Sequence, residues 1–387
     1  MRCGSPPNNG TCASQSGSSR NWSKSQALGG LLSNNASISP LAGAHKAYLA
    51  DCTSDAYIGN ASASPRTFGW HLKGQAAVEA TIMSLVRDFG LGSQANQTLV
   101  FGGASSGAMG AMLLLDHIPT LLASLDARPV RLLGFADSAY WIDDECGIDS
   151  RGMVRGERPS ERSTAWPVGC RMAVQTRSGL AAGLGRGYFP GFPGAVQGLL
   201  RLSNAESRLS ADCLAVYRPR RGTGHASGGD TWKCGLAQYQ MPFVRSRYLM
   251  VSSLADSFQL TSNLGHMPVT EAERAYAARY AQRSADHGRR LLRSTSPGGG
   301  NHDGQGKSMV YMPNCFSHST SLHAEFHTRN LSGWSVADVL ASMVSQPDDH
   351  DEQLEWEWAQ SAARSKIPER GLVDNLELGF AGSTSCG

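Results

Sequence analysis

The sequence predicts an α/β fold: a mostly parallel central sheet flanked by helices, with loop-rich insertions. Short apolar runs alternate with longer stretches in which apolar residues recur at helical spacing. The order strand, helix, strand, helix, strand is typical of parallel strands joined by crossover helices. The chain has 387 residues, of which 41% are hydrophobic and 17% charged, so it can bury a sizeable core. Because no repeat or clean linker divides it, we predict a single domain over residues 1–387.

The first half of the chain supplies most of this alternation. Leu72–Phe89 carries apolar residues at positions 76, 77, 80, 82, 85 and 86 and stops at Gly90, which indicates a helix. Around it we expect, in order, a loop over 1–42 with one short helix at Ser25–Leu32, a strand at His45–Ala50, a strand at Thr98–Phe101, a helix at Ser106–Leu115 and a strand at Val130–Phe135.

The second half begins with a stretch that is harder to interpret. Residues 147–230 are rich in Arg, Gly and Pro, and we expect insertions over the sheet ends there. Beyond them the sequence predicts a strand at Arg247–Leu254, a polar helix at Thr270–Arg293, a strand at Lys307–Met312 and a helix at Val336–Val344.

Charge and hydropathy argue against two classes of partner. A formal charge of +3 over this length is too small to indicate nucleic-acid binding. The best apolar run, Ala108–Leu115, is under half of the roughly 18 residues that a membrane helix needs. We therefore expect no nucleic acid, no stable membrane insertion and a monomer.

The nine cysteines and the glycosylation sequons favour an oxidising, secretory route. No two cysteines form a C-x-x-C pair, so the spacing of a zinc ribbon is absent. We therefore expect a secreted protein, although the segment Met1–Pro7 is polar and shows no signal peptide; the alternative is a cytosolic protein with nine free thiols. The cysteines are Cys3, Cys12, Cys52, Cys146, Cys170, Cys213, Cys234, Cys315 and Cys386, and the sequons begin at Asn9, Asn21, Asn35, Asn60, Asn96 and Asn330.

The sharpest local motif is Gly103-Ala104-Ser105-Ser106-Gly107. It fits G-x-S-x-G between a predicted strand and a predicted helix, the context that a serine nucleophile requires. A sharp turn there lifts the Ser105 hydroxyl above the sheet edge, and the helix directs its first N–H groups toward a developing oxyanion. We prefer Ser105 as nucleophile, with Ser106 donating its backbone N–H to the oxyanion hole. The alternative is an ordinary glycine-rich turn.

A serine nucleophile needs a base, and the base needs an orienting acid. In this fold class the partners follow in the order Ser, Asp, His, each after a later strand. Asp256 follows the strand Arg247–Leu254, and His318 follows the strand Lys307–Met312. The alternatives are a helix N-cap for Asp256 and a surface loop residue for His318.

For four other features of the sequence, a structural or solvent-exposed role is a better interpretation than a functional one. Gly304–Ser308 has some likeness to a phosphate-binding loop, but Asn301 stands where the first glycine belongs and a strand follows. His323, Glu325 and His327 place two histidines at i, i+4, a possible metal pair, but a solvated helix face is the default. The acidic run Asp348–Glu352 is expected to be a solvated loop and helix start, and the pair Asp116-His117 to be structural.

Five separate motifs, in order through nearly the whole chain, resemble the pectin acetylesterase/Notum family of carboxylesterases, which have an α/β-hydrolase-like fold. The nucleophile turn Gly103–Ala108 matches most of the family's Gly-x-Ser-Ala-Gly-Gly. The others are the Asp51–Gly59 turn with Lys73-Gly74-Gln75, the segment Ala136-Asp137-Ser138, Trp232-Lys233-Cys234 before Asp256, and Cys315-Phe316-Ser317-His318.

The resemblance implies that Ser105, His318 and Asp256 form a catalytic triad that needs no metal and no cofactor. The implied reaction is two-step ester hydrolysis through an acyl-enzyme. The family's substrates are acetyl groups on pectic polysaccharide or a fatty acyl group on a secreted signalling protein. No aromatic cluster is evident near Ser105 in the sequence, which favours the short acyl group. A catalytically dead, glycan-binding relative is the third alternative.

The chain departs from the family pattern at its start. The family carries a Gly-Gly segment on an early strand, whose backbone supplies the other half of the oxyanion hole, and Met1-Arg2-Cys3 matches only its end. The expectation is a chain that begins too late, lacking its first strand. The resemblance suggests disulfides Cys3–Cys12, Cys213–Cys234 and Cys315–Cys386, with Cys146–Cys170 as the remaining pair. Cys52 is then left unpaired.

Overall fold

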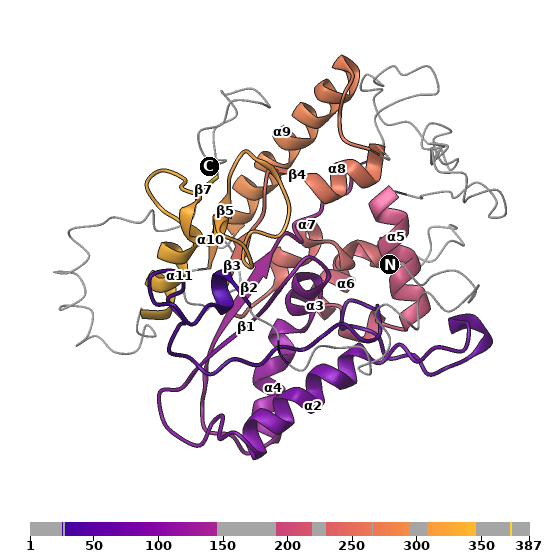
Figure 1. Cartoon of the computed structure of the whole chain (residues 1–387). Coiled ribbons are helices and arrows are strands. Elements are labelled where there is room, and N and C mark those ends of the chain that lie inside the picture. Colours follow the sequence, from indigo (N-terminus) through magenta and orange to yellow (C-terminus); the bar gives the residue numbers. More distant parts are fainter. Residues whose placement is uncertain are drawn as a thin grey trace.

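The computed structural model describes residues 25, 28–144, 191–218, 230–264, 266–294, 308–345 and 372–373 (Figure 1). Its centre is a sheet of five parallel strands in the order β1-β2-β3-β5-β7. The predicted α/β class with a parallel sheet is therefore confirmed. The strands are β1 (Thr98–Ala104), β2 (Arg131–Asp137), β3 (Tyr248–Val251), β5 (Met309–Met312) and β7 (Leu372–Val373).

A second, two-stranded parallel sheet extends the carboxyl ends of β3 and β5. It pairs β4 (Ala255–Asp256) with β6 (Phe316–Ser317), so that Asp256 lies opposite Ser317. Each strand follows a main strand after a short connection, so this small sheet brings the segments after β3 and β5 together.

Helices follow the strands in the order that the hydrophobic pattern predicts. The helices expected around Leu72–Phe89, Ser106–Leu115, Thr270–Arg293 and Val336–Val344 are all present, with ends shifted by a few residues. The described helices are α2 (Gly74–Arg87), α3 (Ser106–Leu114), α4 (Ile118–Ser124), α5 (Gly191–Ser203), α6 (Ala211–Tyr217), α7 (Ala237–Gln240), α8 (Ser257–Leu264), α9 (Glu271–Ser294), α10 (Glu325–Thr328) and α11 (Val336–Ser345), with 3₁₀ turns η2 (Gly30–Leu32), η3 (Pro65–Thr67), η4 (Leu115–His117), η6 (Glu206–Arg208), η7 (Asp230–Gly235) and η8 (Met241–Phe243).

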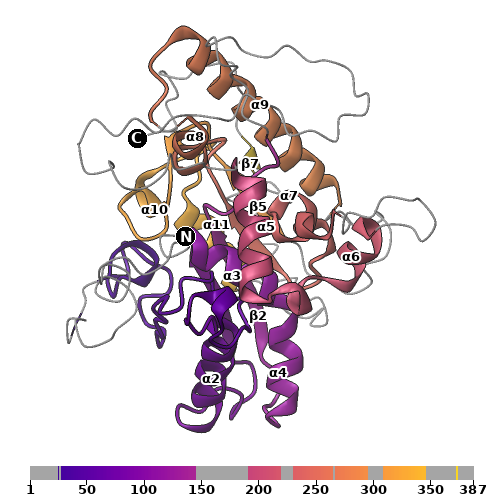
Figure 2. The same cartoon turned by 90° about the vertical axis from the view of Figure 1, so that its right-hand side faces the viewer.

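The sheet is buried on both faces, which explains why its strands are continuous apolar runs. Along β3, Tyr248 and Met250 pack with α3, α5, α7 and α9, whereas Leu249 and Val251 pack with α10 and α11. Figure 1 shows this layering, with α11 and α3 on opposite sides of the strands. Figure 2 shows α2 and α4 side by side at the end of the molecule away from α9.

The apolar composition of α3 reflects its position in the core. Seven of its nine residues are buried, and it packs on β1 and β2. The continuous helical segment Ser106–Ser124 is long and apolar enough to cross a membrane, with 56% of it buried inside the protein. The expectation that no part of the chain is long and apolar enough for a membrane helix was therefore wrong. A core helix has the same composition, and the absence of membrane insertion stays a prediction.

Two predicted elements of the N-terminal part differ from the structure. His45–Ala50 is not a strand, because its side chains lie mostly exposed and its backbone joins neither sheet. Of the helix expected at Ser25–Leu32, the structure describes only the 3₁₀ turn η2. The described part of 147–230 is helical, and the single domain over 1–387 stays a prediction.

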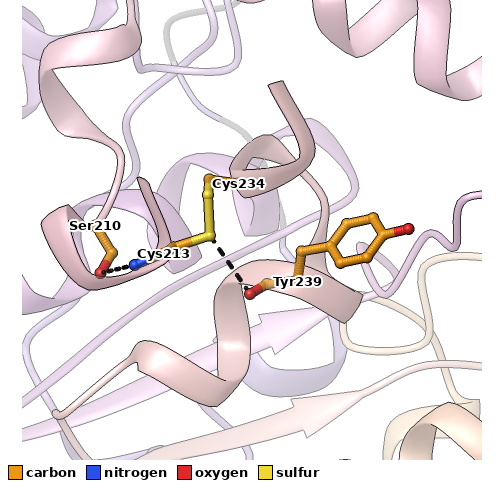
Figure 3. Close-up of a disulfide and its surroundings, with 4 residues drawn as sticks. All are labelled: Ser210, Cys213, Cys234 and Tyr239. Carbon is orange, nitrogen blue, oxygen red and sulfur yellow. Dashed lines mark hydrogen bonds between the residues drawn. A yellow bond between two sulfur atoms is a disulfide. The ribbon is translucent and has the colours of Figure 1, made fainter. Parts of the chain in front are cut away.

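A disulfide joins Cys213 of α6 to Cys234 of η7 (Figure 3). Both cysteines are fully buried, and Ser210 accepts the Cys213 N–H at the start of α6. This is the pair that the family resemblance suggests. Cys52 is free and exposed, and Cys315 is disulfide-bonded to a partner outside the described residues, where Cys3, Cys12, Cys146, Cys170 and Cys386 also lie.

Replacing Cys213 and Cys234 together by alanine should lower the free energy of unfolding by about 3 kcal/mol. The bridge closes a loop with a sequence separation of 21, and the loss reflects the larger entropy of the unlinked unfolded chain. Urea unfolding would measure it. The control Cys52→Ala, at an exposed free thiol, should change stability by no more than about 0.5 kcal/mol; equal effects of the two changes would contradict the prediction.

Candidate active site

Ser105 occupies the turn between β1 and α3. Its backbone has φ +55° and ψ −120°, a sparsely populated conformation that costs about 1–3 kcal/mol for a residue with a side chain. Two hydrogen bonds hold it there: its N–H donates to the Asp137 carbonyl at 2.8 Å, and its carbonyl accepts the Met109 N–H at 3.0 Å. The strained turn is thus anchored both to β2 and to the first turn of α3.

Gly103 explains why the motif needs small residues around the serine. A Cβ atom on Gly103 would lie 2.4 Å from the carbonyl carbon of Gly107 and 2.9 Å from the nitrogen of Ala108. These are backbone atoms of α3, which cannot move aside without moving the helix. A glycine at position 103 is therefore what allows α3 to start so close to the end of β1.

The structure brings all three predicted residues of the triad together. His318 Nε2 lies 2.9 Å from Ser105 Oγ, and His318 Nδ1 lies 2.8 Å from Asp256 Oδ2. Asp256 is 1% exposed, and its other oxygen accepts the Gln259 N–H at 2.8 Å. The β4–β6 pair supplies the geometry, because it holds Asp256 opposite the residue before His318. The catalytic roles of these residues stay a prediction.

The protonation of His318 follows from its neighbours. Burial disfavours the charged imidazole, but the hydrogen bond and charge of Asp256, together with the charge of Asp137, outweigh it and raise the pKa of His318 above its ordinary value. Because an ionised Asp256 can only accept a hydrogen bond, a neutral His318 carries its proton on Nδ1. The lone pair of Nε2 then faces the Ser105 hydroxyl and can accept its proton.

Ser106 begins α3, directly after Ser105. The first N–H groups of a helix have no partner within it, and the helix dipole adds positive potential there. The Ser106 N–H lies at that end, which makes it suitable for stabilising an anion beside Ser105. Its part in an oxyanion hole stays a prediction.

Comparisons with known proteins agree on one family. The model of the pectinacetylesterase family matches residues 8–153, which contain the Ser105 turn. The palmitoleoyl-protein carboxylesterases NOTUM of Schmidtea mediterranea and Drosophila melanogaster are each 29% identical to the chain, over 35% and 39% of it. Over these stretches the chain is similar to the pectinacetylesterase family and to the Notum carboxylesterases. A third relative, notum1' of Xenopus laevis, is 22% identical over 67% of the chain and 44% of its own length. The match spans about a quarter of the length of the first two relatives (26% and 24%).

An aromatic cluster lies beside His318, although none is evident near Ser105 in the sequence. The Phe258 ring lies 5.0 Å from the His318 ring, and Trp141 and Phe192 pack on Phe258 at 6.1 and 5.6 Å between centroids. Trp141 and Phe192 are buried, whereas Phe258 is 45% exposed. The three rings come from the segment after β2, from α5 and from α8, so no local pattern reveals them.

Gln259 is a further residue beside this site, and no motif in the sequence indicates it. Besides its backbone bond to Asp256, its buried side chain accepts the Ile142 N–H and donates to the Ile142 carbonyl, at 3.1 and 2.7 Å. The same amide oxygen also accepts the Tyr280 hydroxyl at 2.5 Å, which is the third hydrogen bond of this side chain. Gln259 thus ties the acid of the triad to the segment that carries Trp141.

Among the remaining sequence candidates, those that the structure describes make no hydrogen bond to Ser105, His318 or Asp256. Among the described residues no group of three or more His, Cys, Asp or Glu side chains could hold a metal ion, so His323, Glu325 and His327 form no such cluster. His117 bonds to Glu79 and Arg208, and Asp116 accepts the N–H groups of Arg245 and Ser246, which are structural contacts as expected. Gly304–Ser308 and Asp348–Glu352 fall on residues outside the described ranges, except Ser308 at the start of β5.

Replacing Gly103 by alanine should destabilise the fold and move the Ser105 turn. The added methyl group overlaps the backbone of α3, which should cost about 1–3 kcal/mol in the free energy of unfolding. Thermal unfolding would measure this. Gly43 is the matched control because a Cβ atom there meets nothing within 4 Å. A Gly103→Ala variant as stable as Gly43→Ala would show that the turn is not sterically restricted.

Proposed function

We propose that this chain is a serine carboxylic ester hydrolase in which Ser105 is the nucleophile, His318 the general base and acid, and Asp256 the orienting acid. The observation that carries the proposal is the pair of hydrogen bonds that link Asp256 through His318 to Ser105, beyond the carboxyl ends of β3, β5 and β1. Nucleophile, base and orienting group within hydrogen-bond reach are the arrangement that activates a serine hydroxyl.

The first half of the proposed reaction acylates the enzyme. Ser105 Oγ attacks the ester carbonyl carbon while its proton passes to His318 Nε2, and the imidazolium is stabilised by Asp256 through Nδ1. The tetrahedral intermediate carries its negative charge on the former carbonyl oxygen, where the Ser106 N–H can donate. One such donor contributes about 3–4 kcal/mol to lowering the barrier. His318 then gives the proton to the leaving alkoxide as the C–O bond breaks.

The second half releases the acid. A water molecule gives its proton to His318 Nε2 and attacks the acyl carbon, and the collapse of the second tetrahedral intermediate returns the proton to Ser105 Oγ. The products are a carboxylic acid and an alcohol, and the enzyme is restored. Every proton in this cycle moves at Nε2 of His318, and no step requires a metal or cofactor.

The substrate we propose first is an acetylated polysaccharide such as pectin. One support is the match of residues 8–153 to the pectinacetylesterase family. The other is the exposed Phe258 ring beside His318, which would restrict the space for a long acyl chain and offers a flat apolar surface to a sugar. The second candidate is removal of a longer acyl group from a protein. It is favoured by the names of the relatives and by the two rings packed behind Phe258.

We also propose that the protein is secreted. The Cys213–Cys234 bridge is a feature of oxidising compartments. The sequon asparagines in the described part of the chain, Asn35, Asn60, Asn96 and Asn330, are all exposed, as glycan attachment requires.

Ser105→Ala should abolish hydrolysis of p-nitrophenyl acetate, with a loss in kcat on the order of 10⁶-fold, because among the described residues no other hydroxyl is bonded to His318. Ser106→Ala keeps its backbone N–H and should retain measurable turnover. Stopped-flow release of p-nitrophenol would measure both. The reverse order of effects would make Ser106 the nucleophile. No turnover by folded wild-type protein on any ester would support a glycan-binding relative without catalysis.

The acyl preference should be set in part by Phe258. A series of p-nitrophenyl esters from acetate to decanoate should give the highest kcat/KM for acetate. Phe258→Ala should raise kcat/KM for butyrate relative to acetate by about 10-fold, because removing the ring opens space worth one or two methylene groups. Phe89→Ala, at a phenylalanine exposed elsewhere, is the matched control. A wild-type optimum at octanoate or decanoate, lost in Phe258→Ala, would instead establish the long-acyl candidate.

A further inference from the structure

Asp137 lies at the end of β2, next to the nucleophile turn. It pairs with Ala104 in the register of β1 and β2, and its carbonyl accepts the Ser105 N–H at 2.8 Å. Its side chain is completely buried. In the reaction proposed above Asp137 transfers no proton and forms no covalent bond with the substrate. Its buried carboxylate therefore needs another explanation.

The carboxylate of Asp137 reaches across to the loop that carries His318. Its Oδ2 accepts the Ser321 N–H at 2.6 Å, and its Oδ1 accepts the Ser138 hydroxyl at 2.8 Å. The Ser138 oxygen in turn accepts the Ser319 N–H at 2.8 Å. Asp137 and Ser138 thus hold two backbone N–H groups within three residues of His318.

The residue that follows His318 needs such support. Ser319 has φ +62°, in the left-handed region that residues with a side chain seldom adopt. Ser138 itself has φ +59°, and its N–H is held by the Val251 carbonyl of β3 at 2.7 Å. Two strained residues from distant segments therefore meet through one hydrogen bond, and each is anchored to the central sheet.

We propose that Asp137, acting with Ser138, is a positioning residue that fixes the His318 loop to the Ser105 turn and supplies a second negative charge to the imidazolium. The proposal rests on the esterase function proposed above. Asp137 sets the position of the nucleophile through its carbonyl and that of the base through its carboxylate. Asp256 holds His318 directly at Nδ1, whereas Asp137 acts through the loop backbone.

The charges around His318 are compatible with this second role. Asp256 of β4 and Asp137 of β2 both favour the imidazolium. Burial raises the pKa of Asp137, while the hydrogen bonds from Ser321 and Ser138 and the charge of His318 oppose the rise. The buried Arg329, which donates to Ser317 and Thr320 on the same loop, also interacts with the charge of Asp137. Both Asp137 oxygens accept hydrogen bonds, as expected of a carboxylate.

Two variants separate the positional effect from the electrostatic one. Asp137→Asn removes the charge, so the pKa of His318 should fall, and the acid limb of the kcat/KM profile should move to lower pH by about one unit. Ser138→Ala removes the acceptor for the Ser319 N–H but no charge. It should lower kcat by about 10- to 100-fold, with KM little changed and the acid limb in place.

Asp55→Asn is the matched control. Asp55 is also buried and accepts backbone N–H groups, from Gly74 and Tyr57, but it lies outside the charges that act on His318. This variant should leave the acid limb where it is, whatever it costs in stability. Titration of the His318 ring by NMR, with its signal assigned by its loss in His318→Gln, measures the same pKa without turnover.

The outcomes distinguish this inference from the proposed function. If wild-type protein hydrolyses no ester, the proposed function fails, and the NMR titration of wild type, Asp137→Asn and Asp55→Asn still decides the electrostatic role. An unchanged His318 pKa in Asp137→Asn overturns that role. If Asp137→Asn does not fold, Ser138→Ala decides the positional role, and unchanged kcat in Ser138→Ala overturns it.

Discussion

The hydrogen bond from the Ser105 N–H to the Asp137 carbonyl is the contact on which the site depends. The Ser105 backbone is strained, and it persists only if its surroundings impose it. The parallel register of β1 and β2 places Asp137 beside Ala104, the last residue of β1, so that its carbonyl can accept the Ser105 N–H. Gly103 lets α3 start close to the end of the same strand. The position of the hydroxyl is thus a consequence of strand pairing rather than of contacts made by the serine side chain.

Burial of charge around His318 is the second constraint. Asp137, Asp256 and Arg329 are all nearly inaccessible, and an isolated charge there would cost several kcal/mol. Hydrogen bonds offset that cost for both carboxylates: Asp256 accepts from His318 and Gln259, and Asp137 from Ser138 and Ser321. Two of these four donors, Gln259 and Ser321, are backbone N–H groups, so compensating the buried charges also orders the segments that carry the site.

What the sequence predicted correctly was local. The helices and strands around Ser105, and the turn itself, follow from periodicity and small residues within a few positions. Asp256 and His318 could be predicted because each follows a strand in a fixed order. The Trp141–Phe192–Phe258 cluster and the Asp137–Ser321 bond, with partners 184 residues apart, arise only when the sheet is assembled. The prediction of a strand at His45–Ala50 was wrong for a related reason, because a segment forms a strand only if the edge of a neighbouring strand is available for pairing.

His318 is therefore held from two sides that do not share residues. On one side Gln259 of α8 fixes Asp256, which holds Nδ1, and the neighbouring Phe258 covers the imidazole ring. On the other side Asp137 of β2 and Ser138, which follows it, hold the backbone after His318. The exposed Phe258 ring belongs to the first support, and the proposed nucleophile Ser105, whose N–H donates to the Asp137 carbonyl, belongs to the second. In the proposed reaction, side chains on α8 can thus alter which acyl group is accepted while β2 keeps the distance between His318 and Ser105, because the two supports are anchored to β4 and β2, which belong to different sheets.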